Sequence, residues 1–230
     1  MKADIGKLKN LVESLHGEDA HAKVREALDS LIDRQYYAKY HFDTYRDILT
    51  NKDDIRKKMS FVLLVNDSEY RDRIALEANI IACLQSLHTV HDLLAYMIVY
   101  TLLIDFDDES RINIYSLKDK VSNSPRYQKL LDLLNELTNH VNFKYLAAAS
   151  NHSKHRFHIG PQTGLDMRES ENLKCTFIPF DYKGVHYPKK EIDKFFNSEY
   201  SRESTLIIKI ENELISLLET GENQCQPTSA

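Results

Sequence analysis

Glycine, proline and tryptophan are scarce in this chain, whose 230 residues include 6 Gly, 5 Pro and no Trp. Glycine and proline punctuate turns and break helices, so their scarcity disfavours a turn-rich β architecture and favours long helices. The length is sufficient for one large domain with a substantial core.

Cysteines are few, and long apolar runs are missing. Cys83, Cys175 and Cys225 are odd in number and lack metal-type spacing, which indicates a reduced, cytoplasmic protein. The N-terminus is charged and amphipathic, unlike a signal peptide. The longest apolar run covers residues 93–104, which is shorter than the roughly 20 residues that span a bilayer. We therefore expect a cytoplasmic protein with no membrane partner.

A global excess of positive charge is also absent, since the formal net charge is −5. The charge is uneven, however. Between Lys144 and Lys190 the chain has eight Lys or Arg residues (144, 154, 156, 168, 174, 183, 189 and 190) against four acids (166, 169, 171 and 181). This composition suits either anion recognition or an ordinary solvated loop with scattered charge. No P-loop, dinucleotide glycine motif or Ser/Cys nucleophile motif occurs, and no cofactor is expected.

Three segments show the apolar spacing of long helices. The first covers residues 19–50 without Gly or Pro, and the second runs from the cap signal at residues 66–68 to about residue 104. The third opens at Ser124-Pro125, because proline is tolerated in a first turn, and continues to about residue 148. The latter half of the second segment is apolar almost all round, which predicts the most buried helix.

The pattern changes after His158. Residues 160–164 contain two Gly and one Pro and predict a break. Residues 175–180 and 185–187 flank a turn and predict a short β-hairpin.

Two more helices are expected, over residues 188–196 and 204–219. The predicted fold class is therefore all-α: an antiparallel bundle of long helices with a small β-hairpin near residues 173–187 and a C-terminal helix. We expect a single domain over residues 1–220, with a core over 19–160, an appendage over 165–220 and a disordered tail over 221–230.

The first candidate site is a run of titratable and cationic residues at the end of the third predicted helix. Asn151, Lys154, His155 and His158 share one helical face, since residues three and four apart are neighbours. An imidazole there could accept the proton of a ribose 2′-hydroxyl, while Lys154 or Arg156 stabilises the charged phosphorane. The alternative is a polar helix C-terminus whose cations cap free carbonyls.

The second candidate site is the set His88, His91 and Asp92 within the apolar second helix. Titratable side chains in such a helix cost stability unless they are paired, so they either hydrogen-bond to another helix or bind a ligand. A carboxylate here could orient an imidazole of the first site. His88 and His91 with His152 and His155 also suggest a metal, but bundled metal sites use mainly carboxylates, and no metal is expected.

Two weaker patterns lie on the first predicted helix. Arg34 and His41 have a loose Arg-to-His spacing. Four tyrosines, Tyr36, Tyr37, Tyr40 and Tyr45, are interpreted as bundle packing with wet hydroxyls rather than as a base-stacking platform.

The order of these features resembles the HEPN superfamily of bacterial helical-bundle proteins. The matching residues are Leu87, His91, Asp92, Leu93 and Leu94 on the buried helix, and Asn151 and His155 at the end of a later helix. The resemblance implies a four- or five-helix bundle, often dimeric. Members are frequently metal-independent endoribonucleases of toxin–antitoxin, CRISPR or anti-phage systems, and others are inactive nucleotide- or RNA-binding scaffolds.

The chain departs from this family at one position. Active members are expected to carry Arg, then four to six residues, then His, often with Asn directly after the Arg. Here Ser150 precedes Asn151, so Lys154 and Arg156 are the candidate replacement cations, although an Arg at another helical position points elsewhere.

The leading hypothesis is a HEPN-like homodimer that binds or cleaves RNA without metal, within an anti-phage defence or toxin–antitoxin system. If the protein is an enzyme, it is a metal-independent endoribonuclease in which His155 is the general acid/base, Asn151 orients it and Lys154 and Arg156 bind phosphate. The expected supporting residues are His88, His91, Asp92 and His158. The alternative is a non-catalytic module that binds a nucleotide or a partner protein from the same operon, and a metal-dependent hydrolase ranks third.

Overall fold

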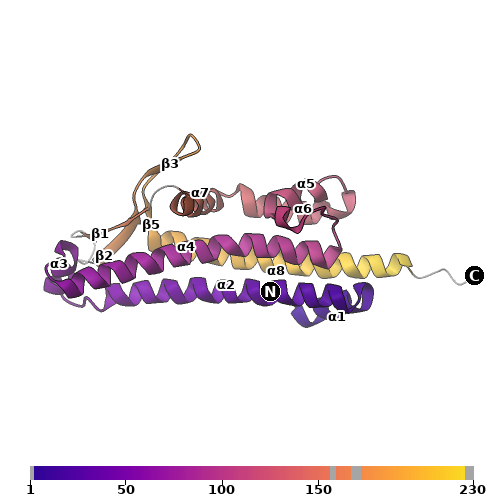
Figure 1. The fold of residues 1–230 in the computed structure, drawn as a ribbon, viewed down its shortest axis with the longest axis horizontal. Helices are drawn as coiled ribbons and strands as arrows, with labels where there is room; N and C mark the ends of the chain where they lie inside the picture. The colour runs from indigo at the N-terminus through magenta and orange to yellow at the C-terminus, as the bar shows by residue number, and fades with distance from the viewer. Residues whose placement is uncertain (1–2, 156–158, 167–171, 226–230) are drawn as a thin grey trace, which may run out of the picture. The chain divides into compact units, whose positions relative to one another are not determined.

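A computed structural model of the chain describes residues 3–155, 159–166 and 172–225. The predicted site residues Arg156 and His158 lie outside the described residues, as does the end of the predicted tail, residues 226–230. The described residues form eight α-helices, two 3₁₀ turns and five short strands (Figure 1). The expectation of a mostly helical protein with a small antiparallel β element is confirmed.

The chain divides into two compact units. The first unit comprises Met1–Arg34, Thr89–His140 and Ser201–Ala230, and the second comprises Gln35–His88 and Val141–Tyr200. Three of the four boundaries fall within long helices, and the fourth, between His140 and Val141, falls between two helices. These helices are α2 (Glu18–Thr50), α4 (Asp67–Leu102) and α8 (Ile192–Cys225).

The two longest sequence-predicted helices are confirmed almost residue for residue. The expected helices over 19–50 and 66–104 correspond to α2 and α4. The predicted cap of α4 is present, because the Asn66 side chain accepts a hydrogen bond from the backbone N–H of Glu69 at 3.0 Å. Apolar periodicity without an internal breaker was therefore a sufficient signal for both helices.

Two other helix boundaries differ from the prediction. The segment from Ser124 is divided into the 3₁₀ turn η2 (Pro125–Tyr127), α6 (Gln128–Asn139) and α7 (Val141–His155). The break lies at His140, whose backbone is extended with ψ 142°. The two helices expected over 188–196 and 204–219 are instead one helix, α8, which continues into the predicted tail as far as Cys225.

Three short helices and one 3₁₀ turn carry no prediction from the sequence. They are α1 (Ile5–His16), α3 (Ile55–Leu63), η1 (Glu109–Arg111) and α5 (Ile114–Val121). Each starts at a polar cap: the side chains of Asp4, Asp54, Asp108 and Asn113 accept hydrogen bonds from backbone N–H groups of the first turn.

The β structure lies in the second unit and is more extensive than the predicted hairpin. One antiparallel sheet has the order β1-β2-β5, made of Pro161–Asp166, Asn172–Phe177 and Lys190–Glu191. A separate hairpin joins β3 (Phe180–Tyr182) to β4 (Val185–Tyr187). The predicted hairpin near residues 173–187 thus contains β2, β3 and β4, and the predicted break over 160–164 lies largely within strand β1.

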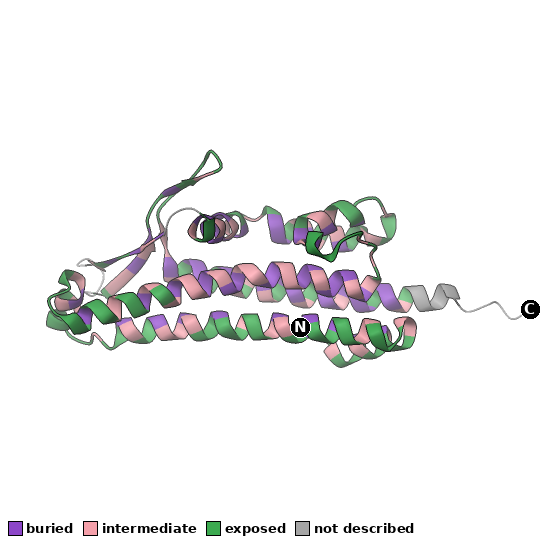
Figure 2. Cartoon of the chain, viewed as in Figure 1, coloured by how far each residue is buried: buried purple, intermediate pink, exposed green. Residues whose placement is uncertain are grey.

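Aromatic side chains form the centre of the core in the second unit. The Tyr145 ring of α7 lies 5.1–6.2 Å, centroid to centroid, from the rings of Phe177, Phe180 and Phe195. The face of α7 that carries Tyr145 is therefore buried in the core. Figure 2 shows the same division into buried and exposed faces along the long helices.

The first unit has its own apolar core, built mainly from helices. Buried leucines of α6 (Leu130, Leu134 and Leu137) and of α8 (Leu206, Leu214, Leu217 and Leu218) belong to it. Hydrogen bonds fix the two helices to each other, since Arg202 donates to the carbonyl oxygen of Leu137 at 3.2 Å. None of the described helices combines the length and the hydropathy needed to cross a bilayer.

Candidate functional site at the end of helix α7

The imidazole of His152 belongs to the core rather than to an open site. Its side chain is buried, and its ring centroid lies 5.4 Å from that of Phe180 and 6.3 Å from that of Tyr182. Both aromatic residues come from β3, so the β3–β4 hairpin covers this position of α7. A histidine held between two aromatic rings is best explained by packing.

The end of α7 also carries three of the predicted site residues. Asn151 is half-buried, whereas Lys154 and His155 are exposed. Because α7 continues to His155, the spacings of three and four residues place these side chains on one face. We call Asn151, Lys154 and His155 the α7-end cluster.

His88 of α4 lies within electrostatic range of this cluster. Burial of its imidazole, together with the positive charge of Lys154, lowers the pKa of His88 to about 4. His88 is therefore neutral at pH 7, so it can accept or donate a hydrogen bond but cannot be a general acid. That His88 supports the α7-end cluster stays a prediction.

Ser150 lies at the position where the family resemblance calls for Arg, and it has no access to solvent. Its exposed fraction is 0%, and its Oγ has no hydrogen-bond partner among the described residues. A guanidinium group at this position would be carried into the core. The departure from the family pattern is therefore a difference in packing as well as in charge.

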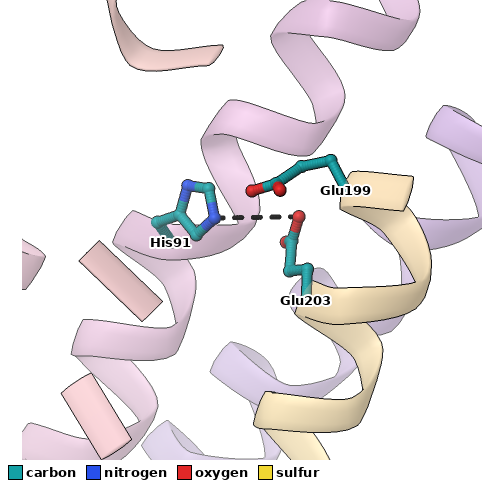
Figure 3. A group of neighbouring side chains, drawn as sticks. All are labelled: His91, Glu199 and Glu203. Atoms are coloured by element: carbon teal, nitrogen blue, oxygen red, sulfur yellow. Dashed lines mark ion pairs between the residues drawn. The ribbon is translucent and has the colours of Figure 1, made fainter. Parts of the chain in front are cut away.

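His91 and Asp92, the other expected supporting residues, belong to the first unit. His91 is buried, and its Nε2 lies 3.7 Å from Oε2 of Glu203 on α8, an ion-pair distance when the imidazole is protonated (Figure 3). Asp92 is half-buried. Their support of the α7-end cluster stays a prediction, whereas the pairing of His91 with α8 agrees with the expected contact to another helix.

Sequence reasoning missed the two glutamates that Figure 3 draws with His91. Glu203 is 1% exposed, and Glu199, one turn earlier on the same helix, is 0% exposed. Carboxylate and imidazole are ligand types that divalent metals accept, so these side chains are the described residues most suited to hold one. The available signal was their spacing of four residues, but charged residues at that spacing are normally read as an exposed helix face.

The weaker patterns on α2 have different outcomes. His41 is fixed by a hydrogen bond between its Nδ1 and the Oδ1 of Asn79 at 2.8 Å. Tyr45 is buried as expected and donates a hydrogen bond to Asp193. Tyr36, Tyr37 and Tyr40 are 49–68% exposed, so interpreting them as bundle packing is wrong for the described chain.

Comparisons with known proteins add no assignment. No family model matches the chain, and neither a curated protein nor a solved structure is detectably similar to it. The functional argument therefore depends on the residues and their geometry.

Proposed function

We propose that this chain is a HEPN-like protein that binds RNA and cleaves it without a metal ion at the α7-end cluster. The observation that carries the proposal is the grouping of an exposed imidazole, an exposed ammonium and an amide on one face of the end of α7. These are the groups that RNA cleavage by internal transphosphorylation requires: a base, a cation for phosphate and a positioning hydrogen-bond partner.

In the proposed reaction His155 accepts the proton of a ribose 2′-hydroxyl. The 2′-oxygen then attacks the adjacent phosphorus, and the bond from phosphorus to the 5′-oxygen breaks. The 5′-oxygen leaves after taking a proton from water or from the protonated imidazole. The products carry a 2′,3′-cyclic phosphate and a 5′-hydroxyl, so atoms and protons balance without a metal or a cofactor.

Lys154 supplies the positive charge in this proposal. Its ammonium is exposed at the end of α7, and its positive charge contributes to the lowered pKa of His88 on α4. A cation at that position stabilises the additional negative charge of the phosphorane. His88 stays neutral at pH 7.

The cellular setting is proposed from the family resemblance alone. A HEPN-like ribonuclease would act in the cytoplasm as a homodimer that brings two α7-end clusters together across a groove. It would belong to a bacterial anti-phage defence or toxin–antitoxin system and be restrained by a partner protein from the same operon.

The test compares RNA cleavage by the wild-type chain and by His155→Ala in the presence of EDTA. We expect cleavage by the wild type and a loss of at least 100-fold in the variant, because general-base catalysis contributes on the order of 10²–10⁴. His186→Ala is the matched control, since His186 is an exposed histidine of the same unit whose partner is Asp181. Undiminished cleavage by His155→Ala would contradict the proposal.

A second function is favoured by the burial of Ser150. If the missing Arg marks a site that no longer catalyses, the chain is a non-catalytic module that binds RNA, a nucleotide or a partner protein. Binding of RNA without cleavage by the wild type, and its loss in Lys154→Gln, would support this function over the first.

A further inference from the structure

A small cavity in the second unit lies among α2, α4 and α8. Its volume is about 150 Å³. Five buried core residues line it: Ala38 and Phe42 from α2, Cys83 and Leu87 from α4, and Phe196 from α8. It shares no residue with the α7-end cluster. A cavity of this size lined by apolar side chains holds a single ring or a short alkyl chain rather than a cluster of waters.

The mouth of the cavity is polar and cationic. Lys39, Arg46, Asn197 and Tyr200 complete the lining. Lys39 is neutralised by an ion pair with Asp43 on the next turn of α2. Arg46 differs, because its one contact among the described residues is with the Phe42 ring, whose centroid lies 5.5 Å from the guanidinium carbon.

An apolar chamber with an uncompensated guanidinium at its mouth has a defined chemical preference. The chamber favours a ring or chain that leaves water, and the guanidinium favours a carboxylate, which it can bind through two parallel hydrogen bonds. The guanidinium carbon lies within cation–π distance of the Phe42 ring, an interaction that arginines commonly make. The exposed amide of Asn197 provides an additional hydrogen-bonding group.

We infer that this cavity binds a small amphipathic carboxylate, with its ring or short chain among Phe42, Leu87 and Phe196 and its carboxylate on Arg46. The site is independent of the proposed RNA cleavage.

The carboxylate end of the ligand could carry further polar groups, because there is open space on another side of Arg46. Arg46 lines a second, more polar hollow of about 410 Å³ together with Thr50, Lys58 and Asp193. Arg46 thus lines both the apolar chamber and the polar hollow. A ligand larger than the chamber would extend its polar part into this hollow.

Calorimetric titration of the full chain tests the inference with four probes. Benzoate and hexanoate combine an apolar part with a carboxylate, benzyl alcohol has the ring without the charge, and inorganic phosphate has the charge without the ring. We expect benzoate and hexanoate to bind at least tenfold more tightly than benzyl alcohol or phosphate. Failure of both carboxylates to bind, or equal binding of phosphate, would overturn the inference.

Two variants separate the contributions of charge and space. Arg46→Gln should weaken benzoate at least tenfold and leave benzyl alcohol unchanged, while Arg56→Gln, at an exposed arginine that does not line the cavity, is the matched control. Ala38→Leu should fill the chamber and abolish binding of both ring compounds. Because Arg46 is exposed, its variant is expected to fold even if Ala38→Leu does not. Unchanged benzoate affinity in Arg46→Gln would contradict the site.

Discussion

Glu211 and His88 are two largely buried titratable side chains whose pKa values move in opposite directions for the same physical reason. Removal from water disfavours the charged form, which raises the pKa of Glu211 to about 7 and lowers that of His88 to about 4. Each shift couples folding to pH, because the folded and unfolded chains bind different numbers of protons.

His88 should make the protein less stable in mild acid. The folded-state pKa lies below the ordinary 6.5, so the stability that the neutral imidazole confers is complete above pH 6.5 and is lost as the pH falls toward 4. Since one pKa unit corresponds to about 1.4 kcal/mol, the loss is ~3 kcal/mol. Urea unfolding of His88→Asn between pH 7.5 and 4 should show a smaller decrease than the wild type. A decrease of the same size would contradict the assignment, and His186→Asn is the exposed control.

Glu211 should change the pH dependence of stability in the opposite direction from His88. Its folded-state pKa lies above the ordinary 4.5, so stability is highest below pH 4.5 and falls as the pH rises through 7. Glu211→Gln should therefore stabilise the protein by up to ~3 kcal/mol at pH 8 and have little effect at pH 4.5. Thermal unfolding at the two pH values measures the difference, with Glu26→Gln on the exposed side of α2 as control. A variant that is no more stable than the wild type at pH 8 would show that this carboxylate is solvated.

At the scale of elements, the β3–β4 hairpin depends on an unusual residue in its turn. Lys183 and Gly184 connect the strands, and both have positive φ, 50° and 77°. These values are typical of a type I′ turn, for which Asn-Gly is the preferred pair. Lysine in the left-handed region is therefore a local cost, since residues other than Gly, Asn and Asp are strained there.

Replacing Lys183 with Asn should stabilise the hairpin and the chain. The expected gain is about 0.5 kcal/mol, and Lys183→Val should be destabilising because a β-branched residue adopts positive φ poorly. Midpoints of urea unfolding for the two variants, with exposed Lys189→Asn as control, measure the effect. If Lys183→Asn and Lys183→Val shift the midpoint in the same direction, the turn is not of this type.

Elements with a strong local signal could be predicted from the sequence. Apolar periodicity and a cap predicted α2 and α4, because nothing in those segments competes with a helix. The break at His140 and the continuity of α8 could not be predicted. His140 is neither Gly nor Pro, and the polar stretch 197–203 resembles a loop although its two glutamates, Glu199 and Glu203, are buried within a helix.

In the candidate site, too, local spacing could be predicted from the sequence, but contacts between distant segments could not. Helical spacing alone placed Asn151, Lys154 and His155 on one face. The burial of His152 depends on β3, a strand separated from it by more than 25 residues in sequence, and the effect of Lys154 on His88 joins two helices. Such relations arise from tertiary packing and carry no periodic signal in the sequence.

At the scale of the whole molecule, the chain contains two compact units and two separate chemical features in the second unit. One is the α7-end cluster of Asn151, Lys154 and His155, proposed to act on RNA. The other is the cavity beside Arg46, inferred to bind a small carboxylate. The two proposals together would allow a small ligand to control RNA cleavage, and the calorimetric and cleavage experiments test them separately.

The most direct test of the central claim is the chemical identity of the ends produced from RNA in EDTA by the wild-type chain and by His155→Ala. The account predicts 2′,3′-cyclic phosphate and 5′-hydroxyl ends with the wild type, and neither end with the variant. Ends that carry a 5′-phosphate and a 3′-hydroxyl, or the same cyclic ends formed equally fast by His155→Ala, would contradict it.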